Sequence, residues 1–478
     1  MDEEQDHFYQ AFAAKDARFD GIFFVGVTST GIYCRPICTA RMPKKANLRF
    51  FKSREAAEKE FFRPCLRCRP ELSPGNAPID SAHRIANQLT ERVDQGDFDE
   101  AEGLEGIAKQ FSLSSRQIRR IVQNAFGVSP LELILTRRLL LAKQLLTETN
   151  LSITEIAFAS GFSSLRRFND AFKKRYRMPP SHLRKAGSMT GSSDSLTLQL
   201  NYRPPYDWQG ILGFLSLRLL KGVEHVEGDC YLRTVQMGQH TGWLKVSHAA
   251  QKNALKVEMS LSLTPVLGAL LGKVRNLFDL TARPDTIATR LSQDPLLEES
   301  VLNNPGLRVP GAFDGFELSV RAILGQQITV SAATKIGGRF VQALAKPIVT
   351  PFPQLYALSP TADSIAKLKI EEIASQGIIR TRARSILCLA EEISAGRLKL
   401  DTSADPDAAM QQLTAIPGIG QWTAHYIAMR ALRWPDAFPK EDVALRKKLG
   451  GVTAKQAEAL SQPWRPWRSY ALLHLWRL

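Results

Sequence analysis

Four cysteines that occur as two close pairs are the first chemistry that the sequence offers. The stretch GIYCRPICTARMPK holds Cys34 and Cys38, and RPCLRCRP holds Cys65 and Cys68, with 26 residues between the pairs. Two short cysteine pairs joined by a longer segment fit tetrahedral Zn²⁺ coordination, each pair covering one side of the ion. A purely structural zinc ribbon is the commonest form of such a site, so a structural zinc and a reactive thiolate both remain open at this point.

The chain is long and strongly basic. Its 478 residues carry a formal net charge of +16 and a pI near 9.6, so we expect about three or four domains and a polyanionic partner, nucleic acid before an anionic membrane surface. The polar start MDEEQDHFYQ is no signal peptide, and no apolar run reaches the roughly 20 residues that span a bilayer. These features predict a cytoplasmic protein with reduced thiols, in which Cys230 and Cys388 are buried apolar residues.

The sequence around the four cysteines resembles a known family. FDGIFFVGVTSTGIYCRPICTARMPKKANLRFF and FFRPCLRCRPEL, within residues 4–75, resemble the N-terminal domain of the Ada methyl-phosphotriester repair proteins. The resemblance implies that Cys34 accepts a methyl group from a DNA phosphotriester, once per chain. Thiolates held by zinc stay nucleophilic at neutral pH, and methylating one removes a negative charge beside DNA. We therefore expect methylation of Cys34 to tighten phosphate binding.

The basic middle of the chain carries an internal repeat. In LEGIAKQFSLSSRQIRRIVQNAFGVSP we expect a helix, a turn and a second helix, for which Ser114–Ser115 offer an N-cap. SITEIAFASGFSSLRRFNDAFKKRY repeats this pattern, with Gly161 in the turn and a helix after Ser163–Ser164. From Leu113 to Lys185 there are 14 Lys and Arg against 4 Asp and Glu.

This repeat, together with PPSHLRK, resembles the double helix-turn-helix of AraC-type regulators. The resemblance implies promoter binding, in which the two second helices face successive major grooves and phosphates. Its candidate DNA contacts are Arg116, Arg119, Arg120, Arg166 and Arg167. The alternative is that the two helix pairs serve only as packing modules.

A change of composition marks the second half. GSMTGSSDS, residues 187–195, predicts a flexible linker. Residues 196–304 mix an apolar helix-like stretch, ILGFLSLRLL, with strand-like alternation, and so predict an α+β unit. The alternating positions are Leu196, Leu198 and Leu200, then Val257, Met259 and Leu261. From about residue 305 the pattern is mainly helical.

One segment of the helical part is typical of a DNA-binding hairpin. Pro417-Gly418-Ile419-Gly420 lies inside LTAIPGIGQWTAHYIAMRAL, and its glycines let backbone N–H groups approach phosphate oxygens. The hairpin alone is a non-specific device. With PDAFPKED and Asp442 after it, however, it resembles the helix-hairpin-helix DNA glycosylases. LNYRPPYDW, VRAILGQQITV and WRPWRSYALLHLW extend the likeness, so that 196–478 resembles the AlkA-type 3-methyladenine glycosylases.

The resemblance implies a pocket that holds a damaged base flipped out of the duplex. Alkylated purines are cationic and attract aromatic faces, and the matching positions are Trp422, Tyr426 and Trp476, with Phe214 as a further wall and Gln326 beside them. The alternative for each ring is an ordinary core aromatic. Asp442 would stabilise positive charge on the sugar as the glycosidic bond breaks. Its alternative is a plain N-cap for the helix VALRKKL.

Some positions depart from the resembling families. Trp422 stands where strand-cleaving relatives carry a Schiff-base lysine, so we expect a monofunctional enzyme that leaves an abasic site. Gln327 occupies the place of a commonly apolar wedge, and Val443 the place of a frequent aromatic residue. The chain has no Pro-Cys-His-Arg motif, so we expect no repair of O6-alkylguanine.

The sequence as a whole resembles bacterial Ada–AlkA fusions. It predicts a multidomain protein with a small α+β zinc domain at 1–77, an all-α double helix-turn-helix at 80–186, the linker, an α+β domain at 196–304 and a mainly α helix-hairpin-helix glycosylase domain at 305–478. The zinc ion would be structural and would activate Cys34, and a monovalent cation would sit at the hairpin. The expected partners are alkylated and promoter double-stranded DNA and RNA polymerase, with a nucleoid location and no membrane. The alternative is a transcription regulator with structural zinc and a catalytically silent glycosylase-like clamp.

Overall fold

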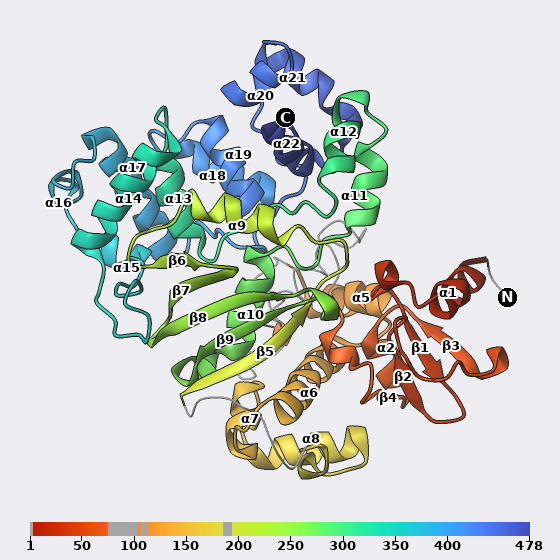
Figure 1. Cartoon of the computed structure of the whole chain (residues 1–478). Coiled ribbons are helices and arrows are strands. Elements are labelled where there is room, and N and C mark those ends of the chain that lie inside the picture. The colour runs from red at the N-terminus through yellow and green to blue at the C-terminus, as the bar shows by residue number, and fades with distance from the viewer. Residues whose placement is uncertain (1–2, 75–103, 106–107, 109–112, 185–193) are drawn as a thin grey trace. The chain divides into compact units, whose positions relative to one another are not determined.

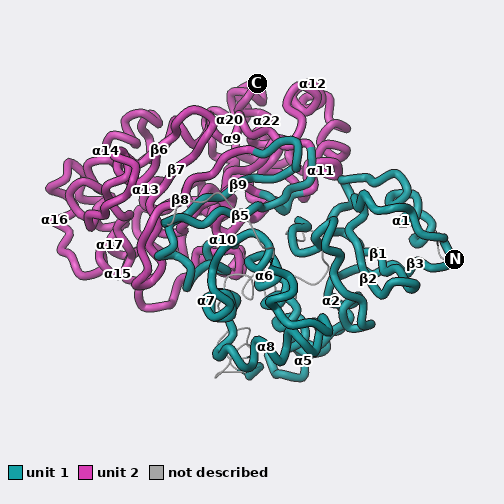
Figure 2. Tube along the Cα trace, turned by 60° about the horizontal axis from the view of Figure 1, so that its bottom comes forward, with its two compact units in different colours: residues 1–204, 249–272, 280–282 teal, residues 205–248, 273–279, 283–478 magenta. Residues whose placement is uncertain are grey.

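The computed structural model describes residues 3–74, 104–105, 108, 113–184 and 194–478 (Figure 1). Most of the predicted first helix at 104–112 and nearly all of the predicted linker at 187–195 lie outside these residues. The chain divides into two compact units, each described here by itself (Figure 2). The first comprises 1–204, 249–272 and 280–282, and the second comprises 205–248, 273–279 and 283–478. Within the described part of the chain, no helix combines the length and the apolarity needed to cross a bilayer.

The first unit begins with a small sheet that positions the cysteines. Its strands are β1 (Phe24–Val27), β2 (Ile32–Cys34), β3 (Leu48–Phe51) and β4 (Arg63–Pro64), in the order β3-β1-β2-β4. β1 pairs antiparallel with β2 and β3, whereas β2 and β4 run parallel. All four residues of β1 are buried, which makes it the centre of the core. Helices α1 (Glu3–Ala13) and α2 (Arg54–Lys59) complete this part.

The first unit also holds three helices of the repeated helix-turn-helix pattern, α5 (Ser115–Phe126), α7 (Ile153–Ala159) and α8 (Leu165–Tyr176), and the helix α6 (Pro130–Glu148) that joins its two halves. Ser114 and Ser164 cap α5 and α8 by accepting backbone N–H groups of the first turn, as predicted. Gly161 has φ +83°, a left-handed conformation that suits glycine in the turn between α7 and α8. Phe168, Phe172 and Tyr176 bury one face of α8.

A buried ion pair joins the cysteine segment to helix α6. The Lys143 ammonium lies 2.5 Å from the Glu71 carboxylate, and both side chains are 1% exposed. Arg69, directly after Cys68, contacts Glu71 at 3.1 Å and Glu148 at 2.8 Å. Glu71 lies in the short 3-10 helix η3 (Pro70–Leu72). The second cysteine pair is therefore anchored to α6 through charged groups that are out of solvent.

The rest of the first unit is the strand pair β5 (Ser195–Asn201) and β9 (Ala254–Ser260), antiparallel in register from Ser195 opposite Ser260. Leu196, Leu198 and Leu200 are buried on alternate positions of β5, as predicted. Leu261 departs from the expectation, because β9 ends at Ser260 and Leu261 begins the 3-10 helix η6 (Leu261–Val266) with 36% of its surface exposed.

The second unit is mainly helical around a small antiparallel sheet. Strands β6 (Glu224–Glu227), β7 (Cys230–Met237) and β8 (His240–Ala249) pair in sequence order. The helices are α9 (Trp208–Ser216), α11 (Pro284–Leu291), α12 (Pro295–Asn303), α13 (Gly315–Leu324), α14 (Val330–Leu344), α15 (Ala362–Ile365), α16 (Ile370–Ala374), α17 (Arg380–Ser394), α18 (Pro406–Ala415), α19 (Gln421–Arg430), α20 (Val443–Lys448), α21 (Ala454–Leu460) and α22 (Arg468–Arg477). Helix α10 (Leu267–Leu277) belongs partly to each unit.

Two local predictions about this part were wrong. The apolar stretch ILGFLSLRLL is helical only to Ser216, where α9 ends. Cys230 and Cys388 are half-buried rather than fully buried. Cys230 packs at the edge of a cluster that contains Trp243 and Leu355, so its neighbours cover only part of its surface.

We expect Glu71→Gln to destabilise the first unit more than Lys143→Met does. Glu71→Gln leaves the Lys143 ammonium buried without a charge partner, which costs about 3–5 kcal/mol. Lys143→Met removes the cation, and Glu71 keeps its contact with Arg69. Scanning calorimetry of the full chain would measure both shifts.

The control is Glu60→Gln, because Glu60 and Arg49 form an exposed pair at 3.2 Å, and its loss costs at most about 1 kcal/mol. Equal destabilisation by Glu71→Gln and Lys143→Met would show that the buried ammonium does not depend on Glu71.

Candidate functional sites

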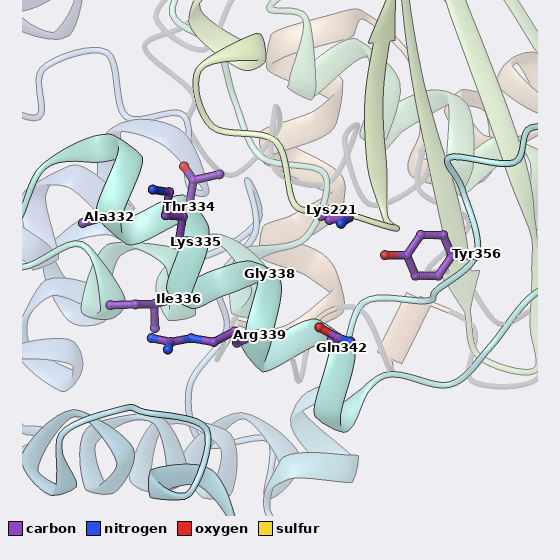
Figure 3. A pocket seen from close by; sticks show the side chains of 9 residues that line it. All are labelled: Lys221, Ala332, Thr334, Lys335, Ile336, Gly338, Arg339, Gln342 and Tyr356. Carbon is purple, nitrogen blue, oxygen red and sulfur yellow. The ribbon is translucent and has the colours of Figure 1, made fainter.

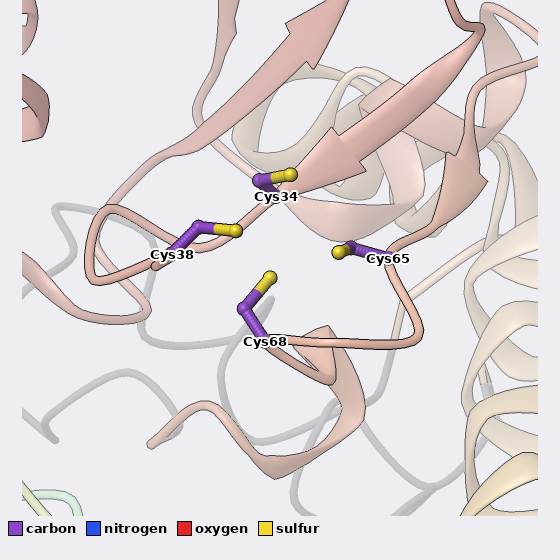
Figure 4. A group of neighbouring side chains, drawn as sticks. All are labelled: Cys34, Cys38, Cys65 and Cys68. Carbon is purple, nitrogen blue, oxygen red and sulfur yellow. The ribbon is translucent and has the colours of Figure 1, made fainter. Parts of the chain in front are cut away.

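The four predicted ligand cysteines come together in the first unit. Cys34 ends β2, Cys38 lies in the loop after it, Cys65 follows β4, and Cys68 lies three residues further on. Their sulfur atoms all lie within 4.8 Å of one another and point toward a common centre (Figure 4). Sulfurs of a tetrahedral zinc site, each about 2.3 Å from the ion, are about 3.8 Å apart, which lies inside this limit. The donor set therefore fits Zn²⁺.

Crowding of the sulfurs shifts their proton affinity. The contact with Cys38 is the largest cause that raises the pKa of the Cys34 thiol, and the contact with Cys34 is the largest that raises the pKa of Cys68. Thiols this close together share protons, unless a cation takes the place of those protons. Zinc supplies that charge and holds all four sulfurs as thiolates.

A backbone amide also contacts the cluster. The N–H of Arg35 donates to the Cys68 sulfur at 3.3 Å. An amide hydrogen bond withdraws charge from a thiolate, so this contact favours the anionic form of Cys68.

The predicted DNA-contact arginines lie on the solvent faces of two helices. Arg116, Arg119 and Arg120 are exposed on α5, opposite the buried Ile118 and Val122. Arg166 and Arg167 are exposed near the start of α8. Arg166 lies 3.9 Å from Asp170, and both side chains are largely exposed, so that this pair is weak. Both helices therefore present cations to solvent, as the sequence predicted.

In the second unit, the Asp442 carboxylate lies between two tryptophans. Its Oδ2 accepts a hydrogen bond from Trp422 Nε1 at 2.8 Å, and its Oδ1 accepts one from Trp476 Nε1 at 3.4 Å. Oδ1 also accepts the backbone N–H of Leu445 at 2.7 Å, so Asp442 is the N-cap of α20. Asp442 is only 9% exposed. Both sequence interpretations of Asp442 are thus compatible, because capping fixes the carboxylate that the tryptophans orient.

Tyr426 and Phe214 extend the aromatic surface from Trp422. The rings of Trp422 and Tyr426 are stacked with centroids 5.4 Å apart and an angle of 8°. Arg430, one turn further along α19, donates to the Tyr426 hydroxyl at 2.8 Å and lies over the Phe214 ring. Burial alone would raise the pKa of Tyr426, but the guanidinium groups of Arg430 and Arg218 lower it.

Sequence reasoning missed Arg218 and Arg430. Their signal is a spacing of four residues on a helix: Arg430 follows Tyr426 by four positions and Trp422 by eight, so all three share one face of α19. Arg218 follows Phe214 by four positions, although α9 itself ends at Ser216.

The hairpin between α18 and α19 has the predicted tight turn. Gly418 has φ +86°, and a Cβ there would lie 2.3 Å from Ser385 Oγ. Ser385 Oγ donates to the Pro417 carbonyl at 2.6 Å, and Gln326 Nε2 donates to the Gly418 carbonyl at 2.9 Å. Gln326 thus braces the hairpin and the start of α19, where it also donates to Thr423 Oγ1 at 3.0 Å. Its role beside the base and the monovalent cation at the hairpin remain predictions.

Gln327 has an unusual backbone conformation next to the hairpin. It is exposed, between α13 and α14, with φ +57°. A non-glycine residue in this left-handed region carries strain of about 1–2 kcal/mol, and such strain persists chiefly at functional sites. Val443 is also exposed, at the first position of α20.

A cavity of about 700 Å³ lies elsewhere in the second unit, along α14. Figure 3 shows Lys335, Arg339 and Gln342 on that helix, with Lys221 and Tyr356 across from them. None of the predicted site residues lines it.

Four segments of the chain match known families. Residues 7–71 match the metal binding domain of Ada, 107–186 a helix-turn-helix domain, 197–314 the AlkA N-terminal domain, and 320–466 the HhH-GPD superfamily of base excision DNA repair proteins. These matches confirm the predicted fold class and, with the four clustered cysteines, the zinc ion.

Relatives match the whole chain and its second half. A Mycobacterium tuberculosis protein, a probable bifunctional transcriptional activator/DNA repair enzyme AlkA, is 36% identical over 485 residues, covering 100% of this chain and 97% of its own. The DNA-3-methyladenine glycosylase 2 of Escherichia coli is 35% identical over 58% of this chain and 95% of its own. The structure of a 3-methyladenine DNA-glycosylase from Archaeoglobus fulgidus aligns with a TM-score of 0.53 at 20% identity, over 58% of this chain and 97% of its own, which shows the shared fold.

Helix α19 also carries a half-buried histidine that predicts acid sensitivity. Burial is the largest cause that lowers the pKa of His425 to about 4, and its Nδ1 has no hydrogen-bond partner among the described residues. The unfolded chain takes up this proton near pH 6.5, before the folded protein does. The stability contribution is therefore complete above pH 6.5 and is lost as pH falls toward 4, by up to about 3 kcal/mol.

We expect His425→Gln to flatten the fall in melting temperature of the second unit between pH 6.5 and 4. Calorimetry as a function of pH would measure this fall. His182→Gln, at an exposed position, is the control and should leave the profile as it is. An unchanged profile for His425→Gln would assign the acid sensitivity to other groups.

Proposed function

The chain belongs to the family of bifunctional transcriptional activators and DNA repair enzymes that combine Ada-type and AlkA-type segments, and from this premise we propose that it excises alkylated bases such as 3-methyladenine through Asp442. The observation that carries this proposal is the carboxylate of Asp442 held between two indole N–H groups and a helix N-terminus. These donors are neutral, so they fix an anion without cancelling its charge.

The reaction is the hydrolysis of the bond between the base nitrogen and sugar C1′. As this bond breaks, its electron pair stays with the base and positive charge develops on the sugar. Asp442 stabilises that charge, and it orients the water that attacks C1′ and loses a proton. Trp422 in place of a lysine leaves no amine for a Schiff base, so the product is an abasic site and the strand stays intact.

The aromatic residues and the hairpin prepare the base for this reaction. Trp422, Tyr426, Trp476 and Phe214 hold the flipped base by stacking. Gln327 fills the gap that the base leaves in the duplex, and its exposed, strained position supports this role. The backbone N–H groups of Gly418 and Gly420 contact phosphates through the hairpin.

We expect Asp442→Asn to lower the release of 3-methyladenine by about 10²–10³-fold, the usual loss when one group that stabilises transition-state charge is removed. Asparagine is also a good N-cap, so α20 and the fold are preserved. Single-turnover release from methylated DNA is the measurement.

Asp294→Asn is the matched control. Asp294 also caps a helix, α12, and accepts a tryptophan N–H, from Trp464 at 2.6 Å. It should release the base at the wild-type rate. Equal rates for wild type and Asp442→Asn would favour the alternative, a transcription regulator in which the glycosylase-like part only clamps DNA.

We further propose that Cys34 accepts a methyl group from a DNA methyl phosphotriester. The Cys34 sulfur attacks the methyl carbon, the carbon–oxygen bond breaks, and its electron pair remains on the phosphate, which becomes a diester anion. The match of residues 7–71 to the metal binding domain of Ada supports this proposal. Zinc keeps the four sulfurs deprotonated. The thioether product is stable, so each chain reacts once.

We expect one methyl group per chain, located on Cys34, after the protein is incubated with methylated DNA and its peptides are analysed by mass spectrometry. Cys34→Ser should take up none, whereas Cys230→Ser should react like wild type, because Cys230 lies outside the cluster. Methyl groups on another ligand cysteine, or on none, would reduce the four cysteines to a structural zinc site.

We also propose a regulatory role for the first unit. The exposed arginines of α5 and α8 bind promoter DNA, and methylation of Cys34 removes a negative charge and strengthens that binding. The protein then activates transcription through RNA polymerase and acts at the nucleoid. The domain boundaries that correspond to these roles are 1–77, 80–186, 196–304 and 305–478, with the linker at 187–195.

A further inference from the structure

Two guanidinium groups face the same aromatic ring, that of Phe214. Arg218 Cζ lies 3.8 Å from the centroid of the Phe214 ring, and Arg430 Cζ lies 4.9 Å from it. Arg430 also lies 5.5 Å from the Tyr426 centroid. Burial, the largest cause, lowers the pKa of Arg218; Tyr426 raises it and Arg430 lowers it again. The two cations are therefore near enough to repel each other.

Neither cation is neutralised. Arg430 donates to the carbonyls of Pro310 and Gly311 at 2.8 and 2.9 Å, and Arg218 donates to the Phe214 carbonyl at 3.0 Å. Among the described residues, no carboxylate forms an ion pair with either one.

The contrast with two neighbouring arginines is informative. Arg321 and Arg233 both contact Glu317, at 2.8 and 2.9 Å. Glu224 is a further carboxylate beside Arg321. Arg233 and Arg321 are thus paired with carboxylates, whereas Arg218 and Arg430 are not, within the described residues. An unpaired, partly buried cation is costly, and negative charge arriving with the ligand would offset that cost.

We propose that Arg218 and Arg430 stabilise negative charge on the departing base, and so determine how well the protein excises neutral lesions relative to cationic ones. This inference rests on the proposed glycosylase function. A neutral lesion such as hypoxanthine leaves with the electron pair of the glycosidic bond and becomes an anion, which later takes a proton from water. A cationic lesion such as 3-methyladenine accepts the same electron pair and leaves as a neutral molecule.

The two leaving groups therefore respond oppositely to a fixed positive charge. A guanidinium lowers the energy of a base that becomes anionic as the bond breaks. The same guanidinium repels a base that is already cationic in the ground state. The aromatic rings attract the cationic base, whereas the arginines favour the neutral one, and the balance sets the substrate range.

The same cations could instead bind a DNA phosphate, and kinetics separate the two roles. A phosphate contact is common to all lesions, so its loss weakens every substrate alike. A leaving-group contact acts only on bases that depart as anions. The decisive quantity is thus the ratio of the two release rates within one variant.

The test uses Arg218→Gln in the full chain, because Arg218 is only partly buried. Single-turnover release is measured from identical duplexes that contain hypoxanthine or 3-methyladenine. We expect the hypoxanthine-to-3-methyladenine rate ratio to fall by about tenfold or more, as expected for loss of a charge-assisted hydrogen bond. Arg218→Lys keeps the charge and should retain more of the ratio than Arg218→Gln. Arg397→Gln, in an exposed pair with Glu392, is the control.

The outcomes are distinct. An equal fall for both lesions would overturn the proposal and assign Arg218 to DNA binding. An unchanged ratio in Arg218→Gln would overturn it as well, and if Arg218→Gln does not fold, Arg218→Met, which also removes the charge, is judged by the same criteria. Failure of the glycosylase function itself would show separately, as an absence of 3-methyladenine release by the wild-type protein.

Discussion

The second unit depends on an anion that is held in place without being neutralised. Asp442 receives two indole N–H groups and a backbone N–H, all of them neutral donors. A lysine or arginine at the same distance would hold the carboxylate equally well and cancel its field. Neutral donors satisfy the desolvated oxygens and leave the charge available for a cation that forms nearby. Helices α19, α20 and α22 must all be placed correctly for these three donors to converge.

The zinc site also holds negative charge that is only partly neutralised. Four thiolates around one dication keep an excess of negative charge, and the N–H of Arg35 donates to one of them, at Cys68. Because η3 follows Cys68 directly and carries Glu71 to Lys143 of α6, the geometry of the cysteines and that of the helix-turn-helix part are mechanically connected within the first unit.

The sequence was informative wherever a short motif determines local geometry. Ser114 and Ser164 as caps, the left-handed Gly161 and Gly418, and the two cysteine pairs were all predictable because each involves neighbouring residues. Arg430 with Phe214, or Lys143 with Glu71, was not predictable, because these contacts join residues whose proximity depends on tertiary packing. Trp422 was expected as a stacking wall, and its hydrogen bond to Asp442 could not be inferred from the residue type alone.

Helix α19 contacts the Asp442 carboxylate near its start and carries the Arg430 guanidinium in its last turn. Trp422, Tyr426 and Arg430 are spaced by four residues, so about 12 Å of helix separates the end that contacts Asp442 from the end that carries the guanidinium. Arg430 occupies the last turn, where the helix dipole favours a cation. A glycosidic bond that breaks heterolytically gives a positive sugar and an electron-rich base. A base stacked along Trp422 and Tyr426, with its sugar toward Asp442, would place the positive sugar beside the Asp442 carboxylate. The electron-rich base would then lie toward the Arg430 guanidinium. Rigid charges of this kind need no rearrangement during the reaction, which is the condition under which electrostatic stabilisation is most effective.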